Sequence, residues 1–77
     1  PEFLDVQISD GVVEVRCSPV REIQFMCRGA SGRSVYAEGG AELTSARWEY
    51  AKAAGYLRVQ IADAQGRRAW THPVVLG

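Results

Sequence analysis

The side chains that could carry out chemistry in this sequence are few and widely spaced. The chain has one histidine, His72, and two cysteines, Cys17 and Cys27. A catalytic zinc site needs about three protein ligands. A Ser-His-Asp arrangement would have to use His72, because the chain has no other imidazole. We therefore predict no catalytic, metal-binding or cofactor-binding residue, and we expect His72 to be exposed or to cap a sheet edge.

Charge and hydropathy also exclude several classes of partner. Nine basic and nine acidic residues give a formal net charge of zero, so the chain lacks the basic surface typical of nucleic-acid and membrane-surface binding. Gly29-x-x-Gly32 and Gly39-Gly40 lack the lysine and the strand-to-helix context of a phosphate-binding loop. No apolar run approaches the ~18 residues that a membrane span requires. We expect neither a nucleic acid nor a membrane as a partner.

Aromatic side chains offer the remaining candidates for binding. Trp48 and Trp70 could form a platform on which sugars stack, but Trp48 is better explained as a core residue. Trp70 lies close to Pro73, which marks a sheet edge, and is a candidate for covering the open end of the fold or contacting a partner. Tyr56, Arg58 and Gln60 alternate and should form an outward polar row, either solvated or in contact. The candidate contact residues are Tyr56, Arg58, Trp70 and His72.

Short alternating apolar and polar stretches, separated by turn residues, predict β-strands along the whole chain. Ser18-Pro19 should interrupt the second strand, since proline has no N–H for a ladder. The segment before Tyr50 also fits a helix from Ala41 to Ala54, but Trp48 and Tyr50 suit a pleated surface better. Residues 51–55 should then be a connecting loop. The predicted strands are 3–8, 13–17, 21–28, 35–37, 44–50, 56–61 and 68–76.

Seven short strands at this spacing predict one all-β domain over residues 1–77, an antiparallel β-sandwich of the immunoglobulin-like type. Gly66 should allow the hairpin turn before the last strand, and Pro73 should lie at an edge or a bulge. A chain of 77 residues buries only about 60% of its unfolded surface. Docking against a neighbouring domain would stabilise so small a core.

The two cysteines are predicted to be free and buried. Cys17 shares a face with Val13 and Val15, and Cys27 shares one with Ile23 and Phe25. If the chain reverses between the two strands, six residues at ~3.3 Å each hold the cysteines roughly 20 Å apart, whereas a disulfide needs Cα atoms within about 7 Å. The absence of a predicted disulfide favours a cytoplasmic location over a secreted one.

The run from Tyr56 to Val74 resembles the C-terminal end of bacterial metal-dependent hydrolases of the polymerase-and-histidinol-phosphatase (PHP) superfamily. The resemblance is to the branch whose catalytic barrel is followed by a small sandwich, with the pattern Tyr-x-Arg-Val-x-x-x-Asp-x-x-Gly-x-x-Ala-Trp-Ser-Asn-Pro-Ile. Thr71, His72 and Val74 depart from its Ser, Asn and Ile. The matching residues are Tyr56, Arg58, Val59, Asp63, Gly66, Ala69, Trp70 and Pro73.

The resemblance implies a non-catalytic accessory domain attached to a phosphoesterase. In that family the metal ligands are barrel residues, which would precede Pro1, so none is transferred to this chain. The chain begins without methionine, and we expect it to be a C-terminal fragment whose partner is the preceding catalytic domain. The alternative is a carbohydrate- or protein-binding immunoglobulin-like module of a larger bacterial protein.

Overall fold

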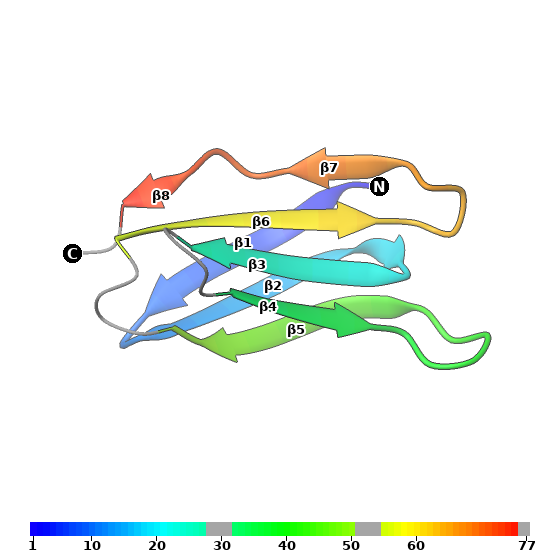
Figure 1. The fold of residues 1–77 in the computed structure, drawn as a ribbon, viewed down its shortest axis with the longest axis horizontal. Coiled ribbons are helices and arrows are strands. Elements are labelled where there is room, and N and C mark those ends of the chain that lie inside the picture. The colour runs from blue at the N-terminus through cyan, green and yellow to red at the C-terminus, as the bar shows by residue number, and fades with distance from the viewer. Residues whose placement is uncertain (28–31, 51–54, 76–77) are drawn as a thin grey trace.

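In a computed structural model, the protein forms two stacked antiparallel sheets (Figure 1). The structure describes residues 1–27, 32–50 and 55–75. One sheet has the strand order β1-β2-β5, and the other has the order β4-β3-β6-β7, with β8 also pairing with β6. The predicted all-β sandwich is therefore confirmed. The strands are β1 (Phe3–Ser9), β2 (Val12–Val20), β3 (Glu22–Cys27), β4 (Gly32–Tyr36), β5 (Leu43–Glu49), β6 (Tyr56–Ala62), β7 (Arg68–Trp70) and β8 (Val74–Val75).

The core comes from the inward rows of three central strands, as the alternation predicted. In β3, in β6 and in β2 as far as Cys17, every second side chain points between the sheets and is almost fully buried; Val20 is buried beyond the register shift in β2. Full burial of one such side chain stabilises the fold by about 1.5–3 kcal/mol relative to exposure. The core residues are Val13, Val15, Cys17, Val20, Ile23, Phe25, Cys27, Leu57, Val59 and Ile61.

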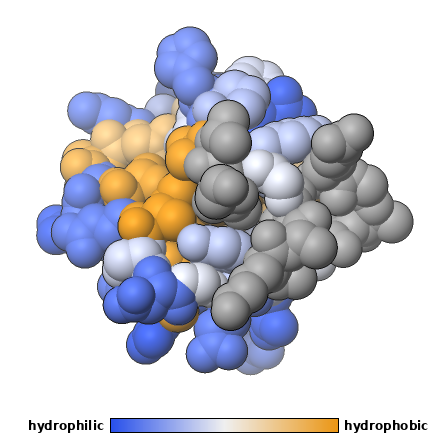
Figure 2. All heavy atoms as spheres, turned by 90° about the vertical axis from the view of Figure 1, so that its left-hand side faces the viewer, coloured by the Kyte–Doolittle hydropathy of each residue, from blue (hydrophilic) through white to orange (hydrophobic). Residues whose placement is uncertain are grey.

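Partly buried apolar residues surround this core. Figure 2 faces the end of the sandwich where β8 and the start of β6 lie, and apolar side chains gather on part of that end among hydrophilic neighbours. Val74 of β8 is 37% exposed there. The core is thus less completely covered at its margin than at its centre, as expected for a domain of this size.

A two-residue turn sets the register of β1 and β2. Asp10 and Gly11 both have positive φ, 50° and 79°, and Ser9 pairs with Val12 across the turn. Positive φ at both central positions is the signature of a type I′ turn, for which Asp-Gly is a preferred sequence. The turn places Val6 opposite Val15 and Ile8 opposite Val13, so that both strands direct apolar side chains inward.

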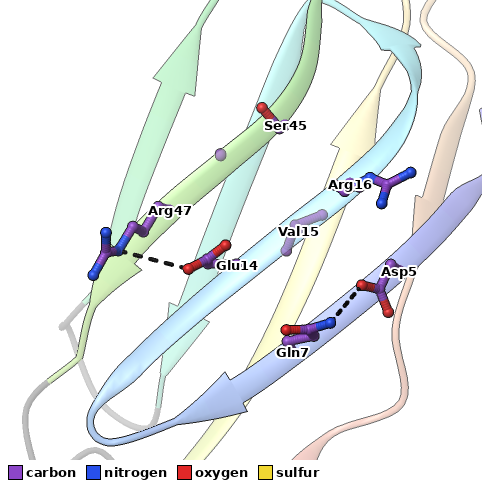
Figure 3. Close-up of a pocket in the computed structure, with 8 residues that line it drawn as sticks. Asp5, Gln7, Glu14, Val15, Arg16, Ser45 and Arg47 are labelled. Carbon is purple, nitrogen blue, oxygen red and sulfur yellow. Dashed lines mark hydrogen bonds and ion pairs between the residues drawn. The ribbon is translucent and has the colours of Figure 1, made fainter.

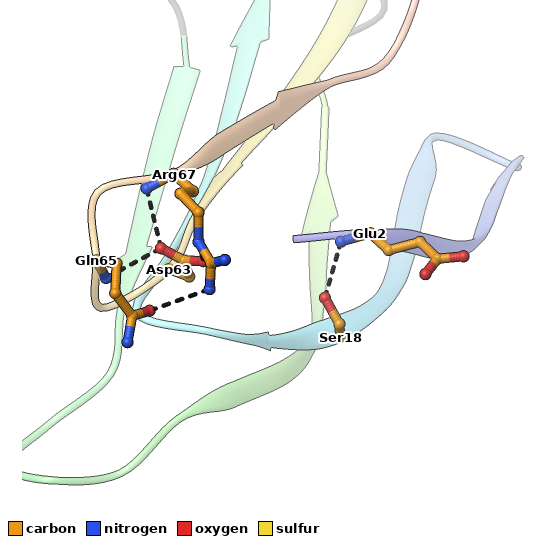
Figure 4. A network of polar contacts seen from close by, with 5 residues as sticks. All are labelled: Glu2, Ser18, Asp63, Gln65 and Arg67. Atoms are coloured by element: carbon orange, nitrogen blue, oxygen red, sulfur yellow. Dashed lines mark hydrogen bonds and ion pairs between the residues drawn. The ribbon is translucent and has the colours of Figure 1, made fainter.

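The predicted end of the second strand at Ser18-Pro19 is wrong, because β2 continues to Val20. The pairing of β2 with β5 changes register between Arg16 and Val20, so Pro19 lies in an irregular stretch where its missing N–H is tolerated. Ser18 also secures the N-terminal segment. Its hydroxyl accepts a hydrogen bond from the Glu2 N–H at 2.8 Å, and its own N–H donates to the Glu2 carbonyl at 2.8 Å (Figure 4).

The chain first crosses from one sheet to the other at a single residue, Arg21. It separates β2 from β3, which belong to different sheets. Its N–H donates to the Ala62 carbonyl, and its carbonyl accepts from the Ala37 N–H. Its guanidinium donates to the carbonyl oxygens of Ala37, Gly39 and Ala41. Arg21 therefore ties the β4–β5 connection to the crossing point.

The ambiguous segment before Tyr50 is a strand, and Trp48 belongs to the core as predicted. Trp48 pairs with Val13 across β2 and β5. Its ring stacks on Phe25 of the opposite sheet, with centroids 5.6 Å apart. The preceding strand is longer than predicted, Gly32–Tyr36 instead of 35–37. The predicted turn at residues 29–32 and loop at 51–55 lie largely outside the described residues.

The prediction of two free, buried thiols is confirmed, with Cys17 in one sheet and Cys27 in the other. Burial raises the pKa of both thiols above their ordinary value, which lowers the fraction of reactive thiolate. We expect slow reaction with a disulfide reagent at pH 8 in native buffer, and rapid modification of both cysteines in urea. Absorbance followed over time measures the rate at which the cysteines are modified. Rapid labelling of either thiol without denaturant would contradict the burial described here.

Candidate functional site

The outer face of the β4-β3-β6-β7 sheet gathers most of the large exposed aromatic side chains. Pairing defines its rows: Gln24 lies between Ser34 and Gln60, and Gln60 lies opposite Trp70. Tyr36 and Trp70 are 64% and 54% exposed. We call this surface the Trp70 face. Its described residues are Glu22, Gln24, Met26, Gly32, Ser34, Tyr36, Tyr56, Arg58, Gln60, Ala62, Arg68 and Trp70.

Trp70 is held in place by the neighbouring strand. Its indole Nε1–H donates to the side-chain Oε1 of Gln60 at 2.7 Å. Gln60 points to the outer face, yet it is only 8% exposed. The predicted polar row is therefore not uniformly solvated: Tyr56 and Arg58 are exposed, but Gln60 is covered. The hydrogen bond fixes the indole orientation and leaves about half of the residue accessible.

A bulge separates β7 from β8 beside Trp70. The three-residue step from Gln60 to Leu57 on β6 corresponds to a four-residue step from Trp70 to Val74. In this bulge the Thr71 hydroxyl accepts a hydrogen bond from the Val59 N–H at 3.0 Å, and the Thr71 N–H donates to the Val59 carbonyl at 3.0 Å. The predicted continuous strand 68–76 is thus broken, whereas the prediction of an edge or bulge at Pro73 is confirmed.

His72 lies inside this bulge and is exposed, as predicted. The structure brings Tyr56, Arg58 and Trp70 onto one face and places His72 at its margin. Sequence patterns did not identify Gln60 as the hydrogen-bond partner of Trp70. They also did not identify Thr71 as the residue whose hydroxyl accepts the hydrogen bond from the Val59 N–H. Alternation with Arg58 on β6 predicts that Gln60 lies on the outer face. That Gln60 pairs with Trp70 follows only from the register of the β6–β7 hairpin, which alternation does not determine.

The hairpin turn that positions β7 is organised by Asp63. Its Oδ1 accepts hydrogen bonds from the backbone N–H groups of Gln65 and Arg67, and its Oδ2 accepts from Arg67 Nε at 2.7 Å (Figure 4). Gly66 has φ 81°, a conformation that glycine adopts at little steric cost. Removal from water alone would raise the pKa of Asp63, but the hydrogen bonds from Arg67 and Gln65 and the Arg67 charge outweigh it, so the pKa is lowered.

This shift predicts how pH acts on stability. A carboxyl whose pKa is lower in the folded than in the unfolded chain stabilises the fold above its unfolded pKa, about 3.9 for Asp. That stabilisation is lost as the pH falls through the folded pKa. We expect Asp63→Asn to melt below the parent at pH 7, with the difference shrinking towards pH 2. Thermal melts across pH 2–7 measure it, with Glu42→Gln, at an exposed position, as control. A difference independent of pH would contradict this assignment.

The outer face of the β1-β2-β5 sheet is a contrasting, highly polar surface. It contains a shallow hollow of about 440 Å³ lined mainly by polar side chains of the three strands (Figure 3). Gln7 donates to Asp5 at 3.0 Å, and Arg47 lies 3.9 Å from Glu14 with both side chains exposed. Exposed ion pairs of this kind contribute about 0–1 kcal/mol. Acidic and basic groups alternate here, so the hollow favours neither an anionic nor a cationic ligand.

Two other kinds of site are absent from the part of the chain that the structure describes. Residues 1–27, 32–50 and 55–75 include no group of three His, Cys, Asp or Glu side chains placed to hold a metal ion. The same residues include no helix with the length and hydropathy of a membrane span. The fold thus defines an antiparallel β-sandwich domain with one aromatic-rich face. Comparison with protein-family models, curated proteins and solved structures finds no match to this chain.

Proposed function

We propose that this chain is a non-catalytic accessory domain of a PHP-type metal-dependent phosphoesterase. The proposal rests on the resemblance of the run from Tyr56 to Val74, which forms β6, the Asp63 turn, β7, the bulge and β8. The observation that carries it furthest is that Tyr56, Arg58 and Trp70 of this run lie exposed on one sheet face. Such a face is suited to contact with another surface.

The strand order supports placing the sandwich in the immunoglobulin-like class. The sheet β1-β2-β5 corresponds to strands A, B and E of that class, and β3, β6 and β7 correspond to C, F and G. Domains with this architecture have many unrelated functions, so the fold by itself does not select an activity. The choice therefore depends on the surface and on the resemblance.

A second candidate is a carbohydrate- or protein-binding module. The half-exposed Trp70, fixed by Gln60, is the observation that favours it, because an immobilised aromatic ring surrounded by amide groups can stack on a sugar and form hydrogen bonds with its hydroxyls. The amide of Gln24 lies on the same row. A binding module does not explain why the other residues of the β6–β7 hairpin resemble the pattern of the PHP family.

Two assays on the 77-residue chain test these candidates. We expect no hydrolysis of p-nitrophenyl phosphate or bis-p-nitrophenyl phosphate with Mn²⁺ or Zn²⁺, since the proposal assigns catalysis to a linked domain. Metal-dependent turnover by the purified chain would overturn it. We also expect no saturable fluorescence change with soluble cello-, xylo- or chito-oligosaccharides. A saturable change that Trp70→Ala abolishes and Trp48→Phe retains would select the binding module instead.

A further inference from the structure

We propose that the Trp70 face is where a covalently linked neighbouring domain docks, with Trp70 as the anchor of the contact. This inference rests on the proposed accessory function and adds the surface, the anchor and the kind of partner. It does not depend on the chemistry that the neighbouring domain performs.

The composition of the two outer faces distinguishes them. In the described part of the chain, the β1-β2-β5 outer face carries no aromatic side chain. The described residues of that face are Asp5, Gln7, Ser9, Val12, Glu14, Arg16, Ser45, Arg47 and Glu49.

The described residues of the Trp70 face instead include Trp70, Tyr36, Tyr56, Met26 and two arginines, with one acidic residue, Glu22. Tryptophan, tyrosine, methionine and arginine are the residue types enriched in protein interfaces, while acidic residues are depleted there. This composition favours a protein partner for the Trp70 face and leaves the opposite face to solvent.

Trp70 has the properties expected of an anchor. Anchoring residues at interfaces are most often Trp, Tyr and Arg. The 2.7 Å bond to Gln60 already restricts the Trp70 indole, so little side-chain freedom remains to be lost on docking. Arg68 lies two residues before Trp70 on the same face, and Arg58 lies two residues before Gln60. These guanidinium groups favour carboxylates on the partner surface.

The size of the face argues for a tethered partner instead of a free one. Four strands spaced 4.7–4.9 Å apart, with six residues at ~3.3 Å each, give a surface on the order of 300–400 Å². Docking would bury roughly twice that area in total, below the ~1,200–2,000 Å² of stable interfaces between separate proteins. The total area buried on docking lies within the ~600–1,500 Å² that is typical of interfaces between domains of one chain. A linker supplies an effective concentration in the millimolar range, which compensates for the small area.

Hydroxyl-radical footprinting of the complete polypeptide that contains this chain tests the docking surface. Leu4 is a suitable internal reference, because it is 59% exposed on the other sheet and Trp70 is 54% exposed. We expect the labelling of Trp70, corrected for intrinsic reactivity, to be severalfold lower than that of Leu4. Equal corrected labelling of Trp70 and Leu4, or protection of Leu4 alone, would overturn the proposal.

A charge reversal provides the second test. In the complete polypeptide, Arg58→Glu should restore the labelling of Trp70 towards that of Leu4, whereas Ser45→Glu on the opposite face should leave it unchanged. Both positions are exposed, so neither change disturbs the core. Protection unaffected by Arg58→Glu would overturn this docking geometry, as would protection that appears only after the oligosaccharides are added. If Trp70 is protected but the polypeptide has no metal-dependent phosphoesterase activity, the docking surface stands and the proposed function fails.

Discussion

Replacing Phe25 with alanine is expected to destabilise the domain by about 3–5 kcal/mol, the usual cost of truncating a fully buried phenylalanine. Phe25 has no exposed surface, and it stacks on Trp48 of the opposite sheet. The change would leave a cavity between the two sheets that the neighbouring β-branched side chains cannot fill without shifting. A domain of this length typically has a stability of roughly 4–12 kcal/mol, so the variant should lose a large share of it.

Urea denaturation followed by far-UV circular dichroism measures this loss. Leu4→Ala is the matched control, since it also truncates an apolar side chain but at a position that is 59% exposed. Surface substitutions of that kind usually change stability by less than about 0.5 kcal/mol. A Phe25→Ala variant that unfolds at nearly the same urea concentration as Leu4→Ala would show that the sheets are not packed around Phe25.

Removing the Arg21 side chain is expected to cost about 1–3 kcal/mol, because its guanidinium donates to three carbonyl groups of the β4–β5 connection. Hydrogen bonds from charged donors contribute about 1.5–3 kcal/mol each when buried and less when exposed, and two of these three are exposed. The backbone bonds from Arg21 to Ala62 and Ala37 would remain. We therefore expect Arg21→Ala to loosen the connection more than it weakens the core.

Limited proteolysis with a glutamate-specific protease separates these two effects, because Glu38 and Glu42 lie exposed in this connection. Cleavage there should be faster in Arg21→Ala than in the parent, and Arg21→Lys should be intermediate, since an ammonium group lacks the planar fork of a guanidinium. Arg47→Ala removes an exposed arginine with only a 3.9 Å ion pair and serves as control. Equal cleavage rates in Arg21→Ala and Arg47→Ala would show that Arg21 does not secure the connection.

The strands and the inward rows could be predicted from sequence because they depend on local alternation. Val13-Glu14-Val15 and Leu57-Arg58-Val59 have a period of two, and a sheet with one buried face demands that period. Asp10-Gly11 and Gly66 likewise mark turns through the φ values that they tolerate. These features involve neighbours in the sequence, so no knowledge of the register between distant strands was needed.

The remaining features depend on contacts between distant residues. The missing N–H of Pro19 predicts the end of a strand, but β2 continues through an irregular stretch to Val20. Alternation places Gln60 on an outward row that is either solvated or in contact, and in the structure Trp70 donates to Gln60, which is buried. The role of Arg21 cannot be predicted from sequence, because its three acceptors are backbone carbonyls, which no side-chain pattern reveals. The contact role of Tyr56, Arg58, Trp70 and His72 remains a prediction.

The crossing at Arg21 also indicates where the chain should not be opened to make a circular permutant. β2 pairs on both sides in its sheet, and so does β3 in the other sheet, so residues 12–27 supply an interior strand to each layer without a break. A circular permutant opened at Arg21 would separate these two strands and remove the shortest of the connections between the layers. New termini belong instead at exposed turn positions, where interruptions are best tolerated.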